Sequence, residues 1–411
     1  MSAATTATSP ASESVRTEVG NIPAIEGLRG VAVLWVMAFH FVVVRDGKFD
    51  DAFIAFLKDW PVLDVFVRNG YLGVDLFFLI TGFLLTLPWF RHADAGMPAP
   101  DWRTFYVRRA RRILPAYYVQ LVFLFFVALP LFYPRIWIQS TPFVVGNLGA
   151  HFTFLHYMTP LTSSSMTLNG ALWTLAIEFQ YYVLLPLVAP LFVRWPWRSL
   201  AAAAVVAAGW RWLAWNDLEA LVNLYLKLGA KAGVTEKEVR HLIATQLPAY
   251  SLHFALGIML GRAWMLRRSK LIEGIGRWVP VFVAAASVLG LYAILRSGTS
   301  FLGQMGWVAF PVVLAAGFAA IVSWPSDLLS KMTSSWPLSS VGRISYSAYL
   351  YHLPLLLLFN AFVPSVTGGL AAILWVAIVV LVSAASFQLV ELRYLSRAAP
   401  REAPVKISPA G

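Results

Sequence analysis

The chain has 411 residues, of which 59% are hydrophobic and 13% charged, and its mean hydropathy is +0.68. Soluble domains are about 45–50% apolar and about 25% charged, so these values indicate a protein whose solvent is lipid. The absence of cysteine excludes disulfides, thiolate metal sites and a cysteine nucleophile. A net charge of +12 would suggest nucleic-acid binding in a soluble protein, but here the positive-inside rule explains the basic residues between apolar runs.

Both ends of the chain differ in composition from the rest. Residues 1–20 are rich in Ser, Thr and Ala and have no apolar core, so they are not a signal peptide and we expect a disordered cytoplasmic tail. Residues 396–411 are expected to form a second cytoplasmic tail. The segment between them, 21–395, is predicted to be one transmembrane domain.

Ten apolar runs are long enough to cross a bilayer, which takes about 20 residues of helix. They lie at about 25–44, 71–90, 113–133, 170–193, 199–215, 248–266, 278–296, 302–323, 344–363 and 369–390. The sequence therefore predicts an all-α fold, a polytopic bundle of about ten transmembrane helices. An eleventh run, 143–158, is short and carries Asn147, His151 and His156, so we expect a re-entrant or interfacial segment buried against protein.

The basic residues predict the orientation of the bundle. Six arginines between positions 91 and 112 follow the second run, which should therefore end in the cytoplasm. With ten spans and both termini inside, every other basic cluster falls on the same side. The connection 216–246 is then extracytoplasmic, and its capping-box pattern at 235–238 predicts one or two helices. This connection is either a spacer or a cap that binds a substrate.

The first predicted span carries charged residues at helical spacing. Arg29 and His40 are eleven residues apart, which places them within about 20° of one another around a helix and about 16 Å apart along its axis. Glu26 lies within about 40° of the same stripe. One face of this helix therefore presents a charged pair near the cytoplasm and a histidine deeper in the membrane. The alternative is a structural Arg–Glu pair beside a core histidine.

Ionisable groups inside a span are candidates for function because their burial is costly. His40 is suited to removing a proton from an attacking alcohol, since the ordinary pKa of histidine is near neutrality. Glu178, expected about 12 Å below the outer surface, could orient the His40 ring. A structural hydrogen bond is the alternative for Glu178. Glu26, Asp75, Tyr346 and His352 are weaker candidates for lining a cavity.

Arginines are concentrated just before the third span, at positions 108, 109, 111 and 112. Such clusters are routine topology signals next to a membrane. Guanidinium groups also bind phosphates with two hydrogen bonds, so the same run could hold a phosphorylated carrier that approaches from the cytoplasm.

Five motifs in this order resemble those of the acyltransferase-3 family of membrane O-acyltransferases, and the match covers about residues 20–395. The motifs are Glu26-Gly27-Leu28-Arg29-Gly30 with His40, Gly73-Val74-Asp75-Leu76-Phe77-Phe78 with Gly82-Phe83, Phe105-Tyr106 with Arg108-Arg109 and Arg112-Ile113-Leu114-Pro115, Leu172-Trp173-Thr174-Leu175 with Glu178, and Ile344-Ser345-Tyr346-Ser347 with His352.

The resemblance implies a ten-span enzyme that takes acyl groups, often acetyl, from cytoplasmic acyl-CoA to acceptors that are usually glycans outside. It implies that His40 is catalytic, that Arg29 is its paired first-span residue, and that Arg109 and Arg112 bind the donor. We expect Arg29 to bind the donor phosphates as well. Glu178 matches a recurrent carboxylate, but many members have a second acidic residue where this chain has Phe179. Some members carry a further hydrolase-like domain, so we expect this chain to finish the transfer itself or to pass the group to another protein.

The predicted function is thus an integral O-acyltransferase of a bacterial cell membrane, with acyl-CoA as co-substrate, a glycan or glycosylated metabolite as acceptor, and no metal or tightly bound cofactor. His40 either deprotonates the acceptor hydroxyl or accepts the acyl group itself, and the sequence leaves both routes open. The main alternative is a proton-coupled transporter, because buried His and Glu also build proton relays. No Gly-x-Ser-x-Gly or phosphate-loop motif occurs in the chain.

Overall fold

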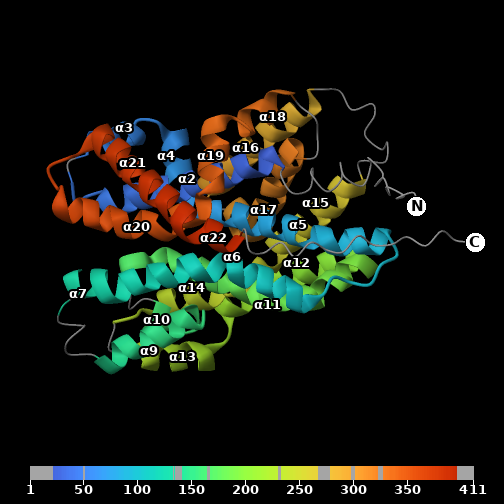
Figure 1. The fold of residues 1–411 in the computed structure, drawn as a ribbon, viewed down its shortest axis with the longest axis horizontal. Coiled ribbons are helices and arrows are strands. Elements are labelled where there is room, and N and C mark those ends of the chain that lie inside the picture. The colour runs from blue at the N-terminus through green and yellow to red at the C-terminus, as the bar shows by residue number, and fades with distance from the viewer. Residues whose placement is uncertain are drawn as a thin grey trace, which may run out of the picture.

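The computed structural model describes residues 22–49, 51–132, 134, 141–163, 167–229, 233–266, 278–297, 301–322 and 327–395. The two predicted tails lie outside these residues. Within them the regular structure is entirely helical, and the long helices run side by side along the long axis of the molecule (Figure 1).

Among the described residues, six helices are long and apolar enough to cross a membrane, and a seventh span results if a pair bent by 55° is counted as one. The six are Pro23–Arg45 (α2), Gly70–Asp94 (η1 and α5), Trp102–Phe132 (α6, η2 and α7), Asn169–Arg194 (the end of η4 and α11), Val279–Ser297 (α16) and Gly368–Leu395 (α21, η7 and α22). The bent pair is Glu236–Ala244 (α14) with Leu247–Leu266 (η6 and α15). The prediction of a polytopic helical membrane protein is confirmed.

Three further predicted spans are helical but are not counted among these. They are Pro196–Asn216 (α12), Phe301–Val322 (α17) and Ser345–Phe362 (α20). α12 carries Arg198 and Arg211, and α20 carries three tyrosines and His352, which lowers the hydropathy of each helix. The remaining helices are short: Ala52–Lys58 (α3), Pro61–Arg68 (α4), Thr141–Phe152 (α9), Pro160–Ser163 (α10), Glu219–Gly229 (α13), Asp327–Thr333 (α18) and Trp336–Arg343 (α19).

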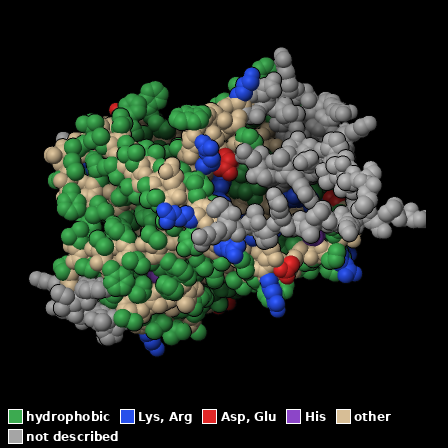
Figure 2. Space-filling view, in the orientation of Figure 1, with side chains coloured by type: hydrophobic (Ala, Val, Ile, Leu, Met, Phe, Trp, Pro, Cys, Tyr) green, Lys and Arg blue, Asp and Glu red, His purple; other side chains and the backbone are tan. Residues whose placement is uncertain are grey.

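Large apolar side chains cover the outside of the bundle. Leu187, Phe282 and Leu381 are 71%, 70% and 70% exposed, which would be costly in water but is favourable in hydrocarbon. Figure 2 shows one face on which hydrophobic side chains predominate and Lys and Arg are few. The surface therefore agrees with a bundle that lies in lipid.

Glycines bring two pairs of helices into backbone contact. A Cβ at Gly30 of α2 would lie 2.3 Å from the carbonyl oxygen of Leu338, so only glycine allows α19 to pack this closely. Between α5 and α15, a Cβ at Gly257 would lie 2.1 Å from the carbonyl oxygen of Leu79. Small residues at helix contacts are the usual means of close packing in membranes.

The short run at 143–158 does not contain a helix that could cross. α9 ends at Phe152, Phe154 turns the chain with φ of 59°, and His156–Met158 (η3) follows. The rings of His151 and His156 stack at 4.2 Å, and both side chains are buried.

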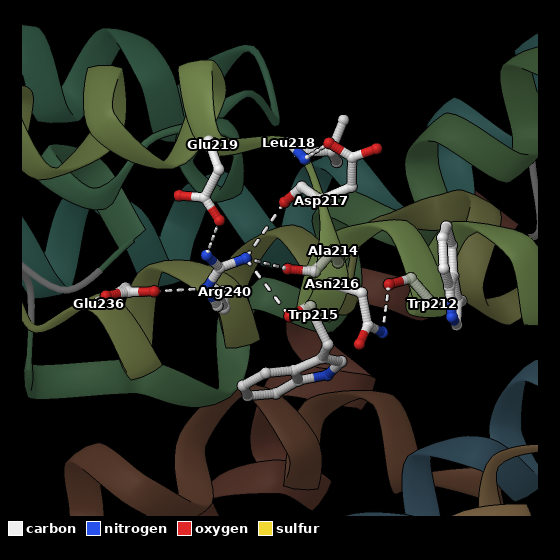
Figure 3. A network of polar contacts seen from close by, with 9 residues as sticks. All are labelled: Trp212, Ala214, Trp215, Asn216, Asp217, Leu218, Glu219, Glu236 and Arg240. Carbon is white, nitrogen blue, oxygen red and sulfur yellow. Dashed lines mark hydrogen bonds and ion pairs between the residues drawn. The ribbon is translucent and has the colours of Figure 1, made fainter.

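The predicted helices of the connection 216–246 are present as α13 and α14, and the capping box between Thr235 and Glu238 is confirmed. Arg240 joins the end of α12 to these helices (Figure 3): its Nη1 donates to the carbonyl oxygens of Ala214 and Asp217 at 3.2 and 3.1 Å. The same guanidinium pairs with Glu219 and Glu236. Arg240 thereby satisfies backbone carbonyls that the end of a helix leaves without partners.

Candidate active site

A cavity of about 330 Å³ lies among α2, α5, α6, α11 and α20. Its polar lining consists of Glu26, Arg29, Thr81, Arg91, Arg109, Arg112, Thr174, Glu178, Tyr182, Ser345, Tyr346 and Tyr349. Four arginines and two glutamates give this lining a formal charge of +2 (4 − 2). Lining residues on α5 run from Val74 to Arg91, which corresponds to about 25 Å along a helix axis. The cavity is therefore elongated and cationic.

The arginines reach the cavity from three helices. Arg109 and Arg112 are three residues apart on α6, so they lie on the same face of that helix. Arg29 of α2 lies 3.7 Å from Glu26, as the spacing of this pair predicts. The buried Nε of Arg109 and Oε2 of Glu26 have no hydrogen-bond partner within the described residues, so both can still bind a ligand.

Glu178 lies in the same cavity and joins two helices. Its Oε1 accepts hydrogen bonds from Thr81 of α5, at 3.1 Å, and from the hydroxyl of Tyr182 one turn further along α11. Among the described contacts, Glu178 does not meet the His40 ring. The structure thus places Glu178 with the arginines and not, as we expected, as the partner that orients His40.

The partner of His40 is another histidine. Nε2 of His352, on α20, lies 3.1 Å from Nδ1 of His40, and the ring centroids are 4.9 Å apart. The His352 side chain is fully buried, whereas His40 is half-buried. Neither residue is among those that line the cavity.

The histidine pair lies just beyond the end of the cavity at which α5 begins. Helix packing places Trp35 and Phe39 against Gly70, so His40 is level with η1 (Gly70–Leu72), which precedes the cavity-lining part of α5. Tyr349 lines the cavity, and its ring lies 5.6 Å from that of His352. Its hydroxyl donates to the carbonyl oxygen of Ala171 at 2.8 Å and accepts from Thr174 at 2.7 Å, which fixes the ring between the two sites.

Of the weaker candidates, Tyr346 lies in the cavity lining and Asp75 lies outside it. Tyr346 lines the cavity and donates from its hydroxyl to the carbonyl oxygen of Ile113 at 2.9 Å. Asp75 is buried outside the lining, where its Oδ1 lies 3.3 Å from Nε2 of His253.

Several residues near the site were missed from the sequence. Arg91, Tyr182 and Tyr349 line the cavity, and Glu391 is buried in the π-helical turn Phe387–Glu391 (η7), where it accepts from Ser347 at 2.5 Å. The signal for Glu391 was a carboxylate directly after the last apolar run, and for Arg91 an arginine directly after the second. The tyrosines carry no such signal, because aromatic residues are common throughout the helices.

Fold and site together define a class: a polytopic helical membrane protein with a cationic cavity and a pair of hydrogen-bonded histidines next to the end of this cavity. In the part of the chain that the structure describes, no three His, Asp or Glu side chains group closely enough to hold a metal ion.

Comparison with known proteins gives the family. The acyltransferase-3 model, described as an acyltransferase domain, matches residues 22–389, and the chain belongs to this family. It is 26% identical to the peptidoglycan O-acetyltransferase OatA of Listeria monocytogenes over 90% of this chain and 55% of the relative. It is 28% identical to the putative peptidoglycan O-acetyltransferase YrhL of Bacillus subtilis over 82% of this chain and 49% of the relative.

A third relative, named regulator of hypoxia-inducible factor 1 from Caenorhabditis elegans, is 23% identical over 81% of this chain and 70% of its own length. The chain thus spans about half the length of the two bacterial relatives. No solved structure matches the chain significantly.

Proposed function

We propose that the protein transfers an acetyl group from cytoplasmic acetyl-CoA to a hydroxyl of an extracytoplasmic glycan in a bacterial cell membrane. The observation that supports this most is the convergence of Arg29, Arg109 and Arg112 on an elongated cavity that leads towards the His40–His352 pair. Phosphates bind arginine through paired hydrogen bonds, and the narrow cavity suits the linear pantetheine arm of the donor.

A second cavity has room for the nucleotide end of the donor. It also measures about 330 Å³ and shares Leu84, Leu85 and Arg109 with the first cavity. Trp89 and Phe105 line it with their ring centroids 5.4 Å apart, and an adenine could pack against these rings. The acetyl group then points along the first cavity, away from this end.

The transfer follows one of two routes at His40. In the direct route, the acceptor oxygen attacks the thioester carbonyl while His40 takes the hydroxyl proton. The C–S bond then breaks, and the leaving CoA thiolate takes the proton from the imidazolium. In the covalent route, an imidazole nitrogen attacks the thioester carbon and CoA leaves as its thiolate, which gives an acetyl-imidazolium. The acceptor oxygen then attacks the acetyl carbon, the C–N bond breaks to restore the neutral ring, and the hydroxyl proton passes to the CoA thiolate. Both routes need the acetyl group to pass beside Tyr349.

The relatives suggest the acceptor. Two of them are named for peptidoglycan O-acetylation, and a cell-wall glycan offers hydroxyls on the side of the membrane opposite the donor. We therefore expect a sugar hydroxyl of peptidoglycan as the acceptor of this chain.

The test uses the full chain in proteoliposomes with [14C]acetyl-CoA and purified peptidoglycan. Base-labile label should appear on the glycan with wild-type protein and fall to background with His40→Ala. Radiolabelled enzyme in the absence of peptidoglycan would favour the covalent route. Wild-type transfer by His40→Ala would exclude the proposed mechanism, and movement of glycan or donor without acetylation would instead favour a transporter.

A further inference from the structure

His352 is held in one tautomer by the backbone of its own helix. Its Nδ1 lies 2.7 Å from the carbonyl oxygen of Tyr349 and 3.2 Å from that of Ala348. A carbonyl oxygen only accepts hydrogen bonds, so this nitrogen carries the proton and donates it. In the neutral ring, Nε2 of His352 therefore has the lone pair and is a hydrogen-bond acceptor.

The proton on the neighbouring His40 ring follows from the same reasoning. Nδ1 of His40 lies 3.1 Å from Nε2 of His352 and 3.0 Å from the carbonyl oxygen of Val36. Both neighbours are acceptors, so Nδ1 of His40 must be the donor. The opposite arrangement, with the proton on Nε2 of His352, would leave two lone pairs facing each other at His40 and Val36.

The neutral His40 ring therefore has its lone pair on Nε2. Within the described residues this nitrogen has no hydrogen-bond partner, and the His40 side chain is half-buried. Nε2 is thus the nitrogen that can take a proton or attack a carbonyl carbon.

Contacts with neighbouring helices hold the two histidine rings next to each other. The indole of Trp375 donates to the carbonyl oxygen of His352 at 3.2 Å, which joins α20 to α21. At the end of α2, the fully buried Arg45 donates to the side chain of Asn360, near the end of α20, and to the carbonyl oxygen of Val366, in the connection between α20 and α21. The two helices that carry the histidines are therefore clamped together.

We infer that His352 is a positioning residue that fixes the tautomer and orientation of His40, so that Nε2 of His40 is the reactive nitrogen. This inference rests on the proposed function. Serine hydrolases use a buried carboxylate for this task. Here Glu178 is bound elsewhere, and a neutral imidazole does the same without burying a charge.

The first test needs no turnover, so it is independent of the proposed function. The protein is labelled with [15N]histidine in lipid nanodiscs, and the His40 signals are assigned by their loss in His40→Ala. Nitrogen–proton correlations should show a protonated Nδ1 and a bare Nε2 on the neutral His40 ring. A proton on Nε2 with a bare Nδ1 would overturn the inference.

The second test compares two replacements of His352. His352→Gln keeps an acceptor near the position of Nε2, whereas His352→Leu removes it. We expect His352→Leu to lower kcat for acetylation of peptidoglycan about 100-fold or more, with the KM for acetyl-CoA unchanged, and His352→Gln to retain most of the activity. The His40 nitrogen signals of His352→Leu should also shift or broaden, because only the Val36 carbonyl then accepts a hydrogen bond from Nδ1.

Two results would contradict a positioning role: equal loss of kcat in both folded variants, or unaltered His40 nitrogen signals in His352→Leu. If wild-type protein acetylates no glycan, the proposed function fails, and the nitrogen signals still decide whether His352 fixes His40.

Discussion

Gln120 of α6 donates from its side-chain amide to the carbonyl oxygen of Leu350 at 2.9 Å, and Asn169 donates to the same oxygen at 2.9 Å. This carbonyl needs side-chain donors because its helical partner four residues on is Pro354, which has no N–H. Two amides from distant segments thus complete the proline-interrupted turn that carries His352.

The paired amides predict a non-additive loss of stability. Gln120→Leu or Asn169→Leu alone should cost about 1 kcal/mol, because the other donor remains. Together they leave a buried carbonyl without a partner, which costs about 1–3 kcal/mol more. Thermal unfolding in detergent checks this against the exposed control Gln388→Leu, which should change little. Strict additivity of the two losses would show that the amides do not share this role.

If the donor binds in these cavities, two arginines of the same run should affect the KM for acetyl-CoA differently. Arg109 lines both cavities, whereas Arg111 is exposed and outside both linings. Removing a charge-assisted hydrogen bond worth about 1.5–3 kcal/mol should raise the KM for acetyl-CoA about 10- to 100-fold in Arg109→Gln. The control Arg111→Gln should stay close to wild type in steady-state kinetics. Similar increases in both variants would mean that the run acts only through its overall charge.

The close approach of α2 and α19 predicts opposite effects at two helical glycines. Gly30→Ala should destabilise the protein by about 1–3 kcal/mol, since the new Cβ would meet the Leu338 carbonyl oxygen at 2.3 Å. At Gly209 of α12 a Cβ has nothing within 4 Å, so Gly209→Ala should stabilise by about 0.5–1 kcal/mol. Melting temperatures of the purified variants measure both. A stable Gly30→Ala protein would argue against this helix contact.

The end of the cavity next to the histidine pair predicts control of acyl length. Phe77 lines the cavity, and its ring lies 6.1 Å from that of Tyr349 beside the histidine pair. Phe77→Ala should therefore admit longer chains and raise the ratio of kcat/KM for butyryl-CoA to that for acetyl-CoA about 10-fold or more. Phe282→Ala, at a 70% exposed position on α16, is the control and should leave the ratio unchanged. An unaltered ratio in Phe77→Ala would place the acyl group elsewhere.

The sequence alone determined that the protein lies in lipid, that its fold is helical, and which charged residues share a helix face near the cavity. Long apolar runs can satisfy their backbone in lipid only as helices, so composition and spacing were sufficient. The helical repeat also placed Glu26 beside Arg29, and the Arg-x-x-Arg spacing placed Arg109 and Arg112 on one face. These are local relationships within a single helix.

Only the tertiary structure decided which helices meet. His40 and His352 are 312 residues apart, and no periodicity within either helix indicates that their rings touch. Glu178 was expected beside His40 because both were placed at similar depth, but depth does not fix the neighbour of a helix face. The contact of Gly70 with α2 sets His40 level with η1. Hydrogen bonds from Thr81 and Tyr182 hold Glu178 among the arginines instead.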